Sequence, residues 1–387
     1  MMVKLFTFFL LICSITGVSV SARNAFLNDE SWTKQNVSTL SWLHKIYFLD
    51  SKQGWIAGSS GTLLATIDGG DNWKTVKLPT NDNLRDVFFS DSENGWLVCE
   101  RPFFLIKSSS DLRSYILETR DGGKSWEKAS FADNVNVQIT RLITAPDKKM
   151  KWAVGEIGSL FSSKSETAKW EKQMSPTKFV LTDGVLFDDA NGFVIGAGAT
   201  ALTTVDAGKT WREALLSDVS KTRFNSIAFA NRQNGWIVGA NGKIFVTGNG
   251  GNVWKAQNSN STVDLHDVFF TSPKEGWITG DDGVILRTKD GGANWEKQES
   301  PTKNKLESIY FNENEGWAVG FGGSILRYKK KAINNATTFS SPNKSFAAPR
   351  VVLKDESSIK FVRVSKQKSF SRRLAPNPKV KSNRFSI

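Results

Sequence analysis

One sequence pattern recurs seven times along this chain and constrains its fold more than any other feature. Each copy has an apolar run, a Gly-Trp pair or its equivalent, a second apolar run, a Gly-rich turn and a third run. The pairs are Gly54-Trp55, Gly95-Trp96, Lys151-Trp152, Gly192-Phe193, Gly235-Trp236, Gly276-Trp277 and Gly316-Trp317. They lie 40 to 43 residues apart, except where the second copy is lengthened. A period near 40 with four short strand-like segments predicts an all-β, seven-bladed β-propeller.

A second motif follows most copies at a fixed distance. It reads Thr-Ile-Asp-Gly-Gly-Asp-Asn-Trp over Thr66–Trp73 and resembles the Asp-box of bacterial-neuraminidase-type repeats. Further copies are Thr119–Trp126, Thr204–Trp211, Thr247–Trp254 and Thr288–Trp295, and Ser163–Trp170 keeps only the length. The acid or amide accepts hydrogen bonds from its own turn, and Gly supplies positive φ. We therefore expect a structural role, and no catalysis or metal binding, for the box residues Asp68, Asp121, Asp206, Asn249 and Asp290.

The seventh copy stops at Tyr328 and Lys329 without a box. Trp32 precedes His44 by 12 residues, the same interval that separates Trp73 from Arg85. We therefore predict that residues 31–37 supply the fourth strand of the last blade. The ring would then be closed by its own N-terminal strand, which leaves no free sheet edge.

The two ends of the chain differ from the repeats. Residues 1–22 combine a basic start, a short apolar run and small residues before Arg23, which predicts a secretory signal peptide ahead of a propeller at 23–329. Ile12 precedes Cys13, so a lipid-attachment signal is not expected. The tail 330–387 carries net charge +12 of the chain's +13 and has a composition typical of disorder. The alternative for this tail is an electrostatic contact with anionic lipid, polysaccharide or an acidic protein.

Composition excludes several functional classes. Only 2 Cys and 2 His are present, too few for a disulfide framework and the minimum for a zinc site. Because the basic charge belongs to the tail, the propeller itself does not have the charge of a nucleic-acid-binding protein. We expect no cofactor, no metal and no nucleic-acid partner, and we expect a monomer.

The second copy contains an insertion. The interval from the turn aromatic to the box Thr or its equivalent is 11 residues in the other copies but 23 between Trp96 and Thr119. The added segment includes Arg101, Phe103 and Phe104. These apolar residues either pack against their own domain or form a protruding contact for a partner or membrane. In a four-stranded meander this insertion lies on the face where each innermost strand begins, opposite the Asp-boxes.

The residues that open the innermost strands form a candidate binding ring on that face. By equivalence of position they are His44, Arg85, Thr140, Asp183, Asn225, His266 and Glu307. Channel-mouth positions are expected to be solvated. The two histidines and the glutamate leave open a metal site or a pH-sensitive contact. We take His44, Arg85, Asn225, His266 and Glu307, with Arg101, Phe103 and Phe104 of the insertion, as candidates for partner binding.

Several phrases resemble the photosystem II stability/assembly factor family. They are Leu84–Phe89, Asn94–Trp96, Gly316–Gly320 and Thr288–Trp295. The resemblance covers residues 31–329 and implies a seven-bladed propeller on the lumenal side of the thylakoid. Family members bind a newly made reaction-centre subunit and perform no chemistry, so photosynthesis-related scaffolding is the implied role. The basic tail is additional to the family pattern.

The expected function is that of an exported, non-enzymatic assembly factor for a membrane or envelope protein, and two other functions are its alternatives. A sialidase needs an arginine triad and a Tyr–Glu pair, and the innermost strands with Tyr47 and Tyr310 lack such a triad. A lectin-like, glycan-binding propeller remains open from sequence. The expected location is the periplasm, the thylakoid lumen or the extracellular space.

Overall fold

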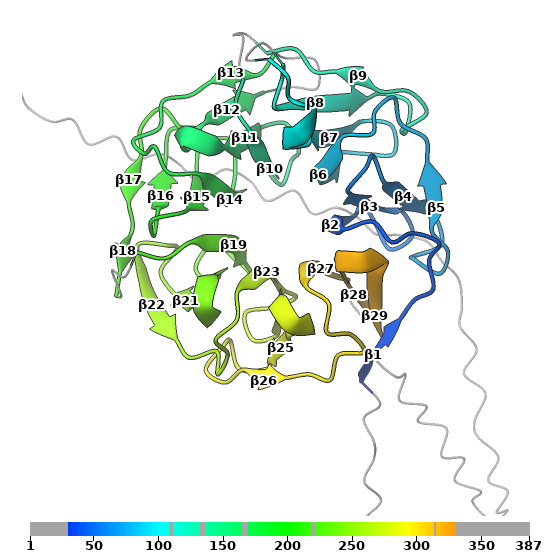
Figure 1. Ribbon diagram of the computed structural model, residues 1–387. Helices are drawn as coiled ribbons and strands as arrows, with labels where there is room; N and C mark the ends of the chain where they lie inside the picture. The colour runs from blue at the N-terminus through cyan, green and yellow to red at the C-terminus, as the bar shows by residue number, and fades with distance from the viewer. Residues whose placement is uncertain are drawn as a thin grey trace, which may run out of the picture. The chain divides into compact units, whose positions relative to one another are not determined.

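The computed structural model describes residues 30–329, apart from 109–110, 132–135, 165–168, 218–220 and 313–314. The predicted signal peptide and basic tail lie outside these residues. The described residues form seven β-sheets arranged as a ring of blades around a central axis (Figure 1). The predicted seven-bladed β-propeller is confirmed.

Each blade is an antiparallel meander that runs from the axis outward, and the bounds of the strands follow. Blade 1 contains β2 (Leu43–Phe48), β3 (Gly54–Gly58), β4 (Leu63–Thr66) and β5 (Lys74–Val76). Blade 2 contains β6 (Asn83–Phe89), β7 (Gly95–Glu100), β8 (Ser114–Thr119) and β9 (Glu127–Lys128). Blade 3 contains β10 (Ile139–Thr144), β11 (Lys151–Gly155), β12 (Leu160–Ser163) and β13 (Glu171–Lys172). Blade 4 contains β14 (Leu181–Leu186), β15 (Gly192–Gly196), β16 (Ala201–Thr204) and β17 (Arg212–Glu213).

Blade 5 contains β19 (Phe224–Phe229), β20 (Gly235–Gly239), β21 (Ile244–Thr247) and β22 (Val253–Gln257), with β18 (Leu215–Leu216) parallel to β22 at its outer edge. Blade 6 contains β23 (Leu265–Phe270), β24 (Gly276–Gly280), β25 (Ile285–Thr288) and β26 (Glu296–Lys297). Blade 7 contains β27 (Leu306–Phe311), β28 (Glu315–Gly320), β29 (Ser324–Lys329) and β1 (Ser31–Lys34). Short 3-10 turns are η1 (Phe103–Leu105), η2 (Glu156–Gly158), η3 (Ala240–Gly242), η4 (Asp281–Gly283) and η5 (Phe321–Gly323). None of the helices in the described part of the chain has the length and apolar character needed to cross a membrane.

The ring is closed by its N-terminal strand, as predicted. Strand β1 pairs antiparallel with β29, and Trp32 lies opposite Tyr328. Trp32 is buried and packs edge-on against Phe311 of β27. Joining the two ends of the propeller in one sheet gives the last blade the four strands of the others.

The repeated Gly-Trp pair has a packing reason. The innermost strand of blade 2 ends in Phe89, whose ring stacks on Trp55 of blade 1 with centroids 3.7 Å apart. A Cβ atom on Gly95 would lie 2.5 Å from that Phe89 ring, so only glycine leaves room for it. The box tryptophan, Trp126, closes the other side edge-on at 6.0 Å. The Gly, the two Trp and the Phe therefore form one aromatic unit that joins neighbouring blades.

The Asp-boxes lie at the end of the blades opposite the start of the innermost strands. Gly69 of the first box donates its N–H to the carbonyl of Lys52, in the turn between β2 and β3. Gly122 makes the equivalent bond to Glu93 in blade 2. The two faces of the ring are therefore a box face and, at the other end, a face that we call the mouth face.

Candidate binding site at the channel mouth

A β-bulge shapes the innermost strand of every blade. In blade 1 the register with β3 shifts between Leu43 and Lys45, and the other six blades show the same shift at the equivalent place. A bulge redirects the side chains on either side of it. As a result, two successive residues of each strand contribute to the channel. The outer set, the mouth ring, is His44, Arg85, Thr140, Thr182, Asn225, His266 and Glu307; the inner ring is Lys45, Asp86, Arg141, Asp183, Ser226, Asp267 and Ser308.

The sequence-based ring was wrong at one position. Leu181 pairs with Gly196 before the register shift, so Thr182 occupies the mouth ring and Asp183 the inner ring. Asp183 accepts the backbone N–H of Ile227 in the next blade at 3.1 Å. Gly184 interrupts the apolar pattern of β14, and this obscured the alignment of blade 4 with the other blades.

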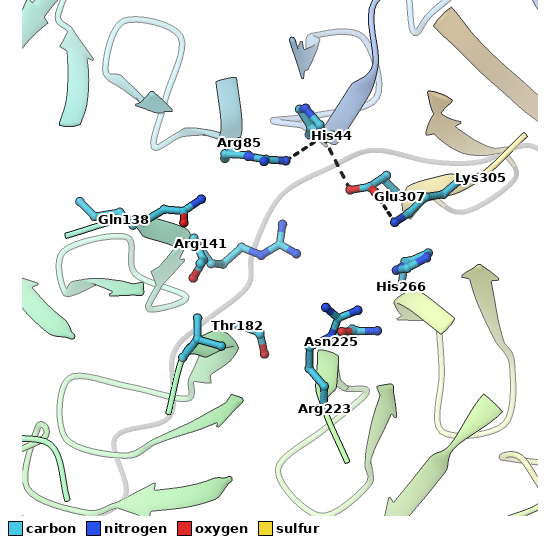
Figure 2. Close-up of a pocket in the computed structure, with 13 residues that line it drawn as sticks. His44, Arg85, Gln138, Arg141, Thr182, Arg223, Asn225, His266, Lys305 and Glu307 are labelled. Atoms are coloured by element: carbon cyan, nitrogen blue, oxygen red, sulfur yellow. Dashed lines mark hydrogen bonds and ion pairs between the residues drawn. The ribbon is translucent and has the colours of Figure 1, made fainter. Parts of the chain in front are cut away.

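His44 is not solvated, contrary to expectation, since its exposed fraction is 5%. Its Nε2 lies 3.0 Å from the Ser59 hydroxyl. Its Nδ1 lies 3.6 Å from a carboxylate oxygen of Glu307 (Figure 2). Burial lowers the pKa of His44, and Glu307 offsets this only in part. Burial opposes ionisation of Glu307, but His44 and Lys305 outweigh it and lower its pKa to about 2. Neutral His44 beside ionised Glu307 is therefore the state at neutral pH.

The other candidates of the mouth ring are also engaged with neighbouring residues. Arg85 is ion-paired with Glu100. His266 lies 2.8 Å from Asp281, in the turn of its own blade. Asn225 donates to the Leu265 carbonyl at 2.7 Å, which leaves its amide oxygen for other partners. Among the described residues, no group of three His, Cys, Asp or Glu side chains is placed to hold a metal ion.

The inner ring is a network of charges that the sequence did not reveal. Arg141 lies between Asp86 and Asp183, at 3.9 and 3.5 Å. Both carboxylates raise the pKa of Arg141 above its ordinary value, although burial alone would lower it. The Nε atom of Arg141 is buried without a hydrogen-bond partner among the described residues. In Figure 2 the Arg141 side chain extends from its strand toward the middle of the channel.

Asp267 shows how this ring joins the blades. Its carboxylate accepts hydrogen bonds from Ser226 of blade 5, at 2.8 Å, and from Ser308 and the backbone of Ile309 in blade 7, at 2.8 and 3.0 Å. Lys45 lies 3.4 Å away. Burial raises the pKa of Asp267, but Lys45, Arg141 and the hydrogen bonds outweigh it, so the pKa is lowered. Asp267 therefore links blades 5, 6 and 7 from inside the ring.

A cavity of about 330 Å³ opens at the mouth of the channel. Its lining includes side chains that sequence reasoning did not select, and these are Gln138, Arg141, Thr182, Arg223 and Lys305. Basic side chains outnumber the single carboxylate, Glu307, in this lining. Arg223 and Lys305 lie just before the innermost strands, so extending each repeat two residues upstream would have found them. The cavity can accept an extended polar ligand with carbonyl or carboxylate oxygens.

The insertion lies on this same face, as the strand order predicted. Arg101 is 3.8 Å from Asp82, the residue before β6. At the other end of the insertion, Arg113 makes a bidentate pair with Glu156 of blade 3, at 2.6 and 2.9 Å. Phe103 and Phe104 are 86% and 80% exposed, so they protrude rather than pack against the domain.

The five box residues accept hydrogen bonds within their own turns. Asp68 accepts from the backbone of Asn72 at 2.9 Å and from the Thr66 hydroxyl at 2.7 Å. The hydrogen bonds from Asn72 and Thr66 lower the pKa of Asp68 to about 2. Equivalent bonds are made by Asp121, Asp206, Asn249 and Asp290. The boxes lie on separate blades, away from the mouth.

Comparison with known sequences identifies relatives of one kind. Photosystem II assembly lipoprotein Ycf48 of Synechococcus sp. (strain CC9902) is 24% identical over 237 residues, which cover 59% of this chain and 66% of that protein. Photosystem II assembly protein Ycf48 of Thermosynechococcus vestitus (strain NIES-2133 / IAM M-273 / BP-1) is 35% identical over 65 residues, 16% of this chain and 19% of that protein. A chloroplastic photosystem II stability/assembly factor, HCF136 of Guillardia theta, is 42% identical over 60 residues, 15% of each chain. The chain thus spans less than two thirds of the length of each of these relatives.

Solved structures share the fold. YCF48 from Cyanidioschyzon merolae superposes with a TM-score of 0.63 at 20% identity, over 77% of this chain and 98% of that one. A structure of YCF48 bound to D1 peptide gives a TM-score of 0.62 at 20% identity, over 78% and 95% of the two chains. Virginiamycin B lyase from Staphylococcus aureus also superposes, with a TM-score of 0.60 at 13% identity over 77% and 99%, so this architecture also occurs in an enzyme.

The family model described as photosynthesis system II assembly factor YCF48 matches residues 71–174, 162–262 and 252–336, which together cover most of the propeller. With the Asp-boxes, the seven blades and the curated relatives, this match is decisive: the chain belongs to the photosystem II assembly factor YCF48 family.

Proposed function

We propose that this protein is an exported, non-enzymatic assembly factor that binds an extended segment of a photosystem II reaction-centre subunit at the mouth of its propeller channel. The observation that carries the proposal is the cavity of about 330 Å³ with Arg85, Arg141, Arg223 and Lys305 in its lining. A relative of the same family has been solved with a D1 peptide, which names the kind of subunit.

The chemistry of the lining suits a peptide. Main-chain carbonyls and acidic side chains accept hydrogen bonds from guanidinium groups, and charge-assisted bonds of this kind are the strong ones. The guanidinium of Arg141 in the cavity lining and the amide oxygen of Asn225 offer donors and an acceptor for a peptide backbone. The histidines and Glu307 are held by neighbouring side chains, which favours a binding role over proton transfer to a substrate.

A peptide-binding measurement with a matched pair of variants tests the proposal. Arg223 lines the cavity and lies 3.3 Å from Asp264, whereas Arg232, on the box face of the same blade, lies 2.5 Å from Asp188. Synthetic peptides covering the exported segments of D1 are titrated against the full chain by fluorescence anisotropy. We expect Arg223→Glu to weaken binding by about tenfold or more, because a charge-assisted bond is replaced by repulsion. Arg232→Glu should bind like the parent.

Equal affinities for the parent and Arg223→Glu would reject the mouth as the site. Mass spectrometry of the recovered peptide tests the non-enzymatic part of the proposal. An intact peptide agrees with it, and a cleaved or modified peptide refutes it.

The relatives compared above carry assembly-factor names, and none of them is named as a lectin or a sialidase.

The remaining parts of the proposal concern the ends of the chain and its assembly state. We infer that residues 1–22 direct export and are removed, that 23–329 act as a monomeric propeller, and that the basic tail 330–387 adds an electrostatic contact with an anionic surface. The compartment is a periplasm, a thylakoid lumen or the extracellular space. N-terminal sequencing of the mature protein and light scattering test the first two statements.

A further inference from the structure

Exposed apolar side chains are unevenly distributed between the two faces of the propeller. Among the described residues, most of the large ones lie on loops of the mouth face, and we call Leu40, Phe103, Phe104, Ile157, Phe179 and Phe321 the apolar rim. The box face has Ile67 and Val205, within its turns. The rim follows blades 7, 1, 2, 3 and 4, while the corresponding turns of blades 5 and 6 present Asn241 and Asp282.

The insertion raises two members of the rim above the ring. Phe103 and Phe104 stand side by side on the short turn η1, and both are more exposed than Phe179 or Phe321 at 53% and 52%. Arg101 and Arg113 at the two ends of the insertion are ion-paired with the body of the propeller. The insertion is therefore attached at its base and holds the two rings outward in solvent.

Ile157 is a rim residue whose presence costs stability. It is 65% exposed and has a φ of 55°, in the left-handed region that β-branched residues avoid. At the same position of their turns, blade 5 has Asn241 and blade 6 has Asp282, residue types that tolerate this backbone. Because this strain does not help the chain to fold, it motivates a functional hypothesis for the exposed Ile157 side chain. The adjacent Glu156 is the partner of Arg113, so Ile157 and the insertion are connected.

Exposed basic side chains accompany the apolar rim. Lys107, Lys178 and Lys303 are exposed in loops of the mouth face, beside rim residues or the cavity. A surface with apolar tips and a basic fringe fits the interface of a bilayer that contains anionic lipid.

We propose that the apolar rim inserts into the interfacial region of a lipid bilayer, with Phe103, Phe104 and Ile157 as the main contacts. The rim side chains come from separate loops around a polar mouth, so they do not form one contiguous patch. A protein partner would need a matching pocket for each tip, whereas a fluid bilayer accepts any set of apolar tips that lie on one face. This inference goes beyond the proposed function and does not depend on it. It would direct the channel mouth toward the membrane.

Vesicle flotation with the full chain tests the inference. The vesicles contain phosphatidylcholine with phosphatidylglycerol, and the salt concentration is raised in steps to screen the basic tail. We expect Phe103→Ser/Phe104→Ser to lower the partition coefficient by about tenfold or more. The matched control, Ile67→Ser/Val205→Ser on the box face, should partition like the parent.

Ile157→Asn separates the loss of a membrane contact from a loss of stability. It should melt about 2 °C or more above the parent, because strain is relieved, and yet partition a few-fold less into the vesicles. Equal partitioning of the parent and Phe103→Ser/Phe104→Ser would overturn the inference, as would a parent that does not float with protein-free vesicles. If the parent chain floats with the vesicles but does not bind D1 peptides, the proposed function alone is refuted.

Discussion

Blade 3 lacks both the glycine and the phenylalanine of the aromatic unit. This double replacement lets us predict how variants at the two positions change the free energy of unfolding. Lys151 stands where the other blades have Gly, and Thr144 stands where most have Phe. Lys151 is 2% exposed, and its ammonium lies 4.5 Å from the ring of Trp96 in blade 2. The lysine therefore covers the Trp face that a phenylalanine covers elsewhere.

The expected energies follow from the geometry of the other blades. Where glycine and Phe are present, a Cβ on the glycine would lie 2.3–2.5 Å from the Phe ring. Thr144→Phe alone should thus clash with Lys151 and cost about 1–3 kcal/mol. Lys151→Gly alone uncovers Trp96 and leaves a cavity, at a cost of about 2–4 kcal/mol. The double variant restores the standard unit and should lie within about 1 kcal/mol of the parent, which requires a favourable coupling of roughly 2 kcal/mol or more.

Urea denaturation of the four proteins, followed by tryptophan fluorescence, measures this coupling. The urea midpoints are compared only if the m-value, the slope of the unfolding free energy with urea concentration, is the same in all four proteins. Differences between midpoints then measure differences in the free energy of unfolding. Additive destabilisation in the double variant would refute the reasoning, because it would mean that Lys151 and Thr144 do not substitute jointly for the aromatic unit.

Three further predictions concern charges. Asp267→Ala should destabilise the propeller by about 3–5 kcal/mol in urea, because Lys45 loses its buried partner; a loss below 1 kcal/mol would show that the inner ring does not join the blades. Glu307 has a pKa of about 2 in the folded protein against an ordinary value of 4.5. Its contribution to the free energy of unfolding is therefore present above about pH 4.5 and is lost as the pH falls toward 2. Glu307→Gln should lower the urea midpoint at neutral pH but not near pH 2. A difference that is the same at both pH values would contradict this. Asp121→Ala should lower the melting temperature, whereas Asp121→Asn should retain most of it because Asn249 performs the same role in blade 5; equal melting of the two variants would count against the structural role of the box.

The repeat allowed most of the architecture to be predicted from sequence. The equal spacing of Trp32 and Trp73 from the next innermost strand identified the closing strand, because blade geometry fixes the distance between an outer Trp and the following strand. Strand order also placed the insertion on the mouth face. These inferences depend on the order and spacing of the strands along the chain, which the repeat pattern of the sequence indicates.

The channel could be predicted only in part. The β-bulge lets two successive residues line the channel, so a period-two alternation counts only one of them and misses the inner ring. Burial of His44 depends on Glu307 in blade 7 and Ser59 in its own blade, and no local pattern encodes such contacts. Neither the ion pairs of Arg141 with Asp86 and Asp183 nor the positive φ of Ile157 can be read from the sequence.

Site-specific photo-crosslinking tests the central claim most directly. A photoreactive phenylalanine analogue is placed at Asn225 in the mouth ring or, as the control, at Ile67 on the box face, and each full-length protein is irradiated with membranes of the source organism. The account predicts that the reaction-centre subunit is cross-linked from position 225 and not from position 67. Cross-linking of that subunit from position 67, or from neither position, would contradict binding at the channel mouth.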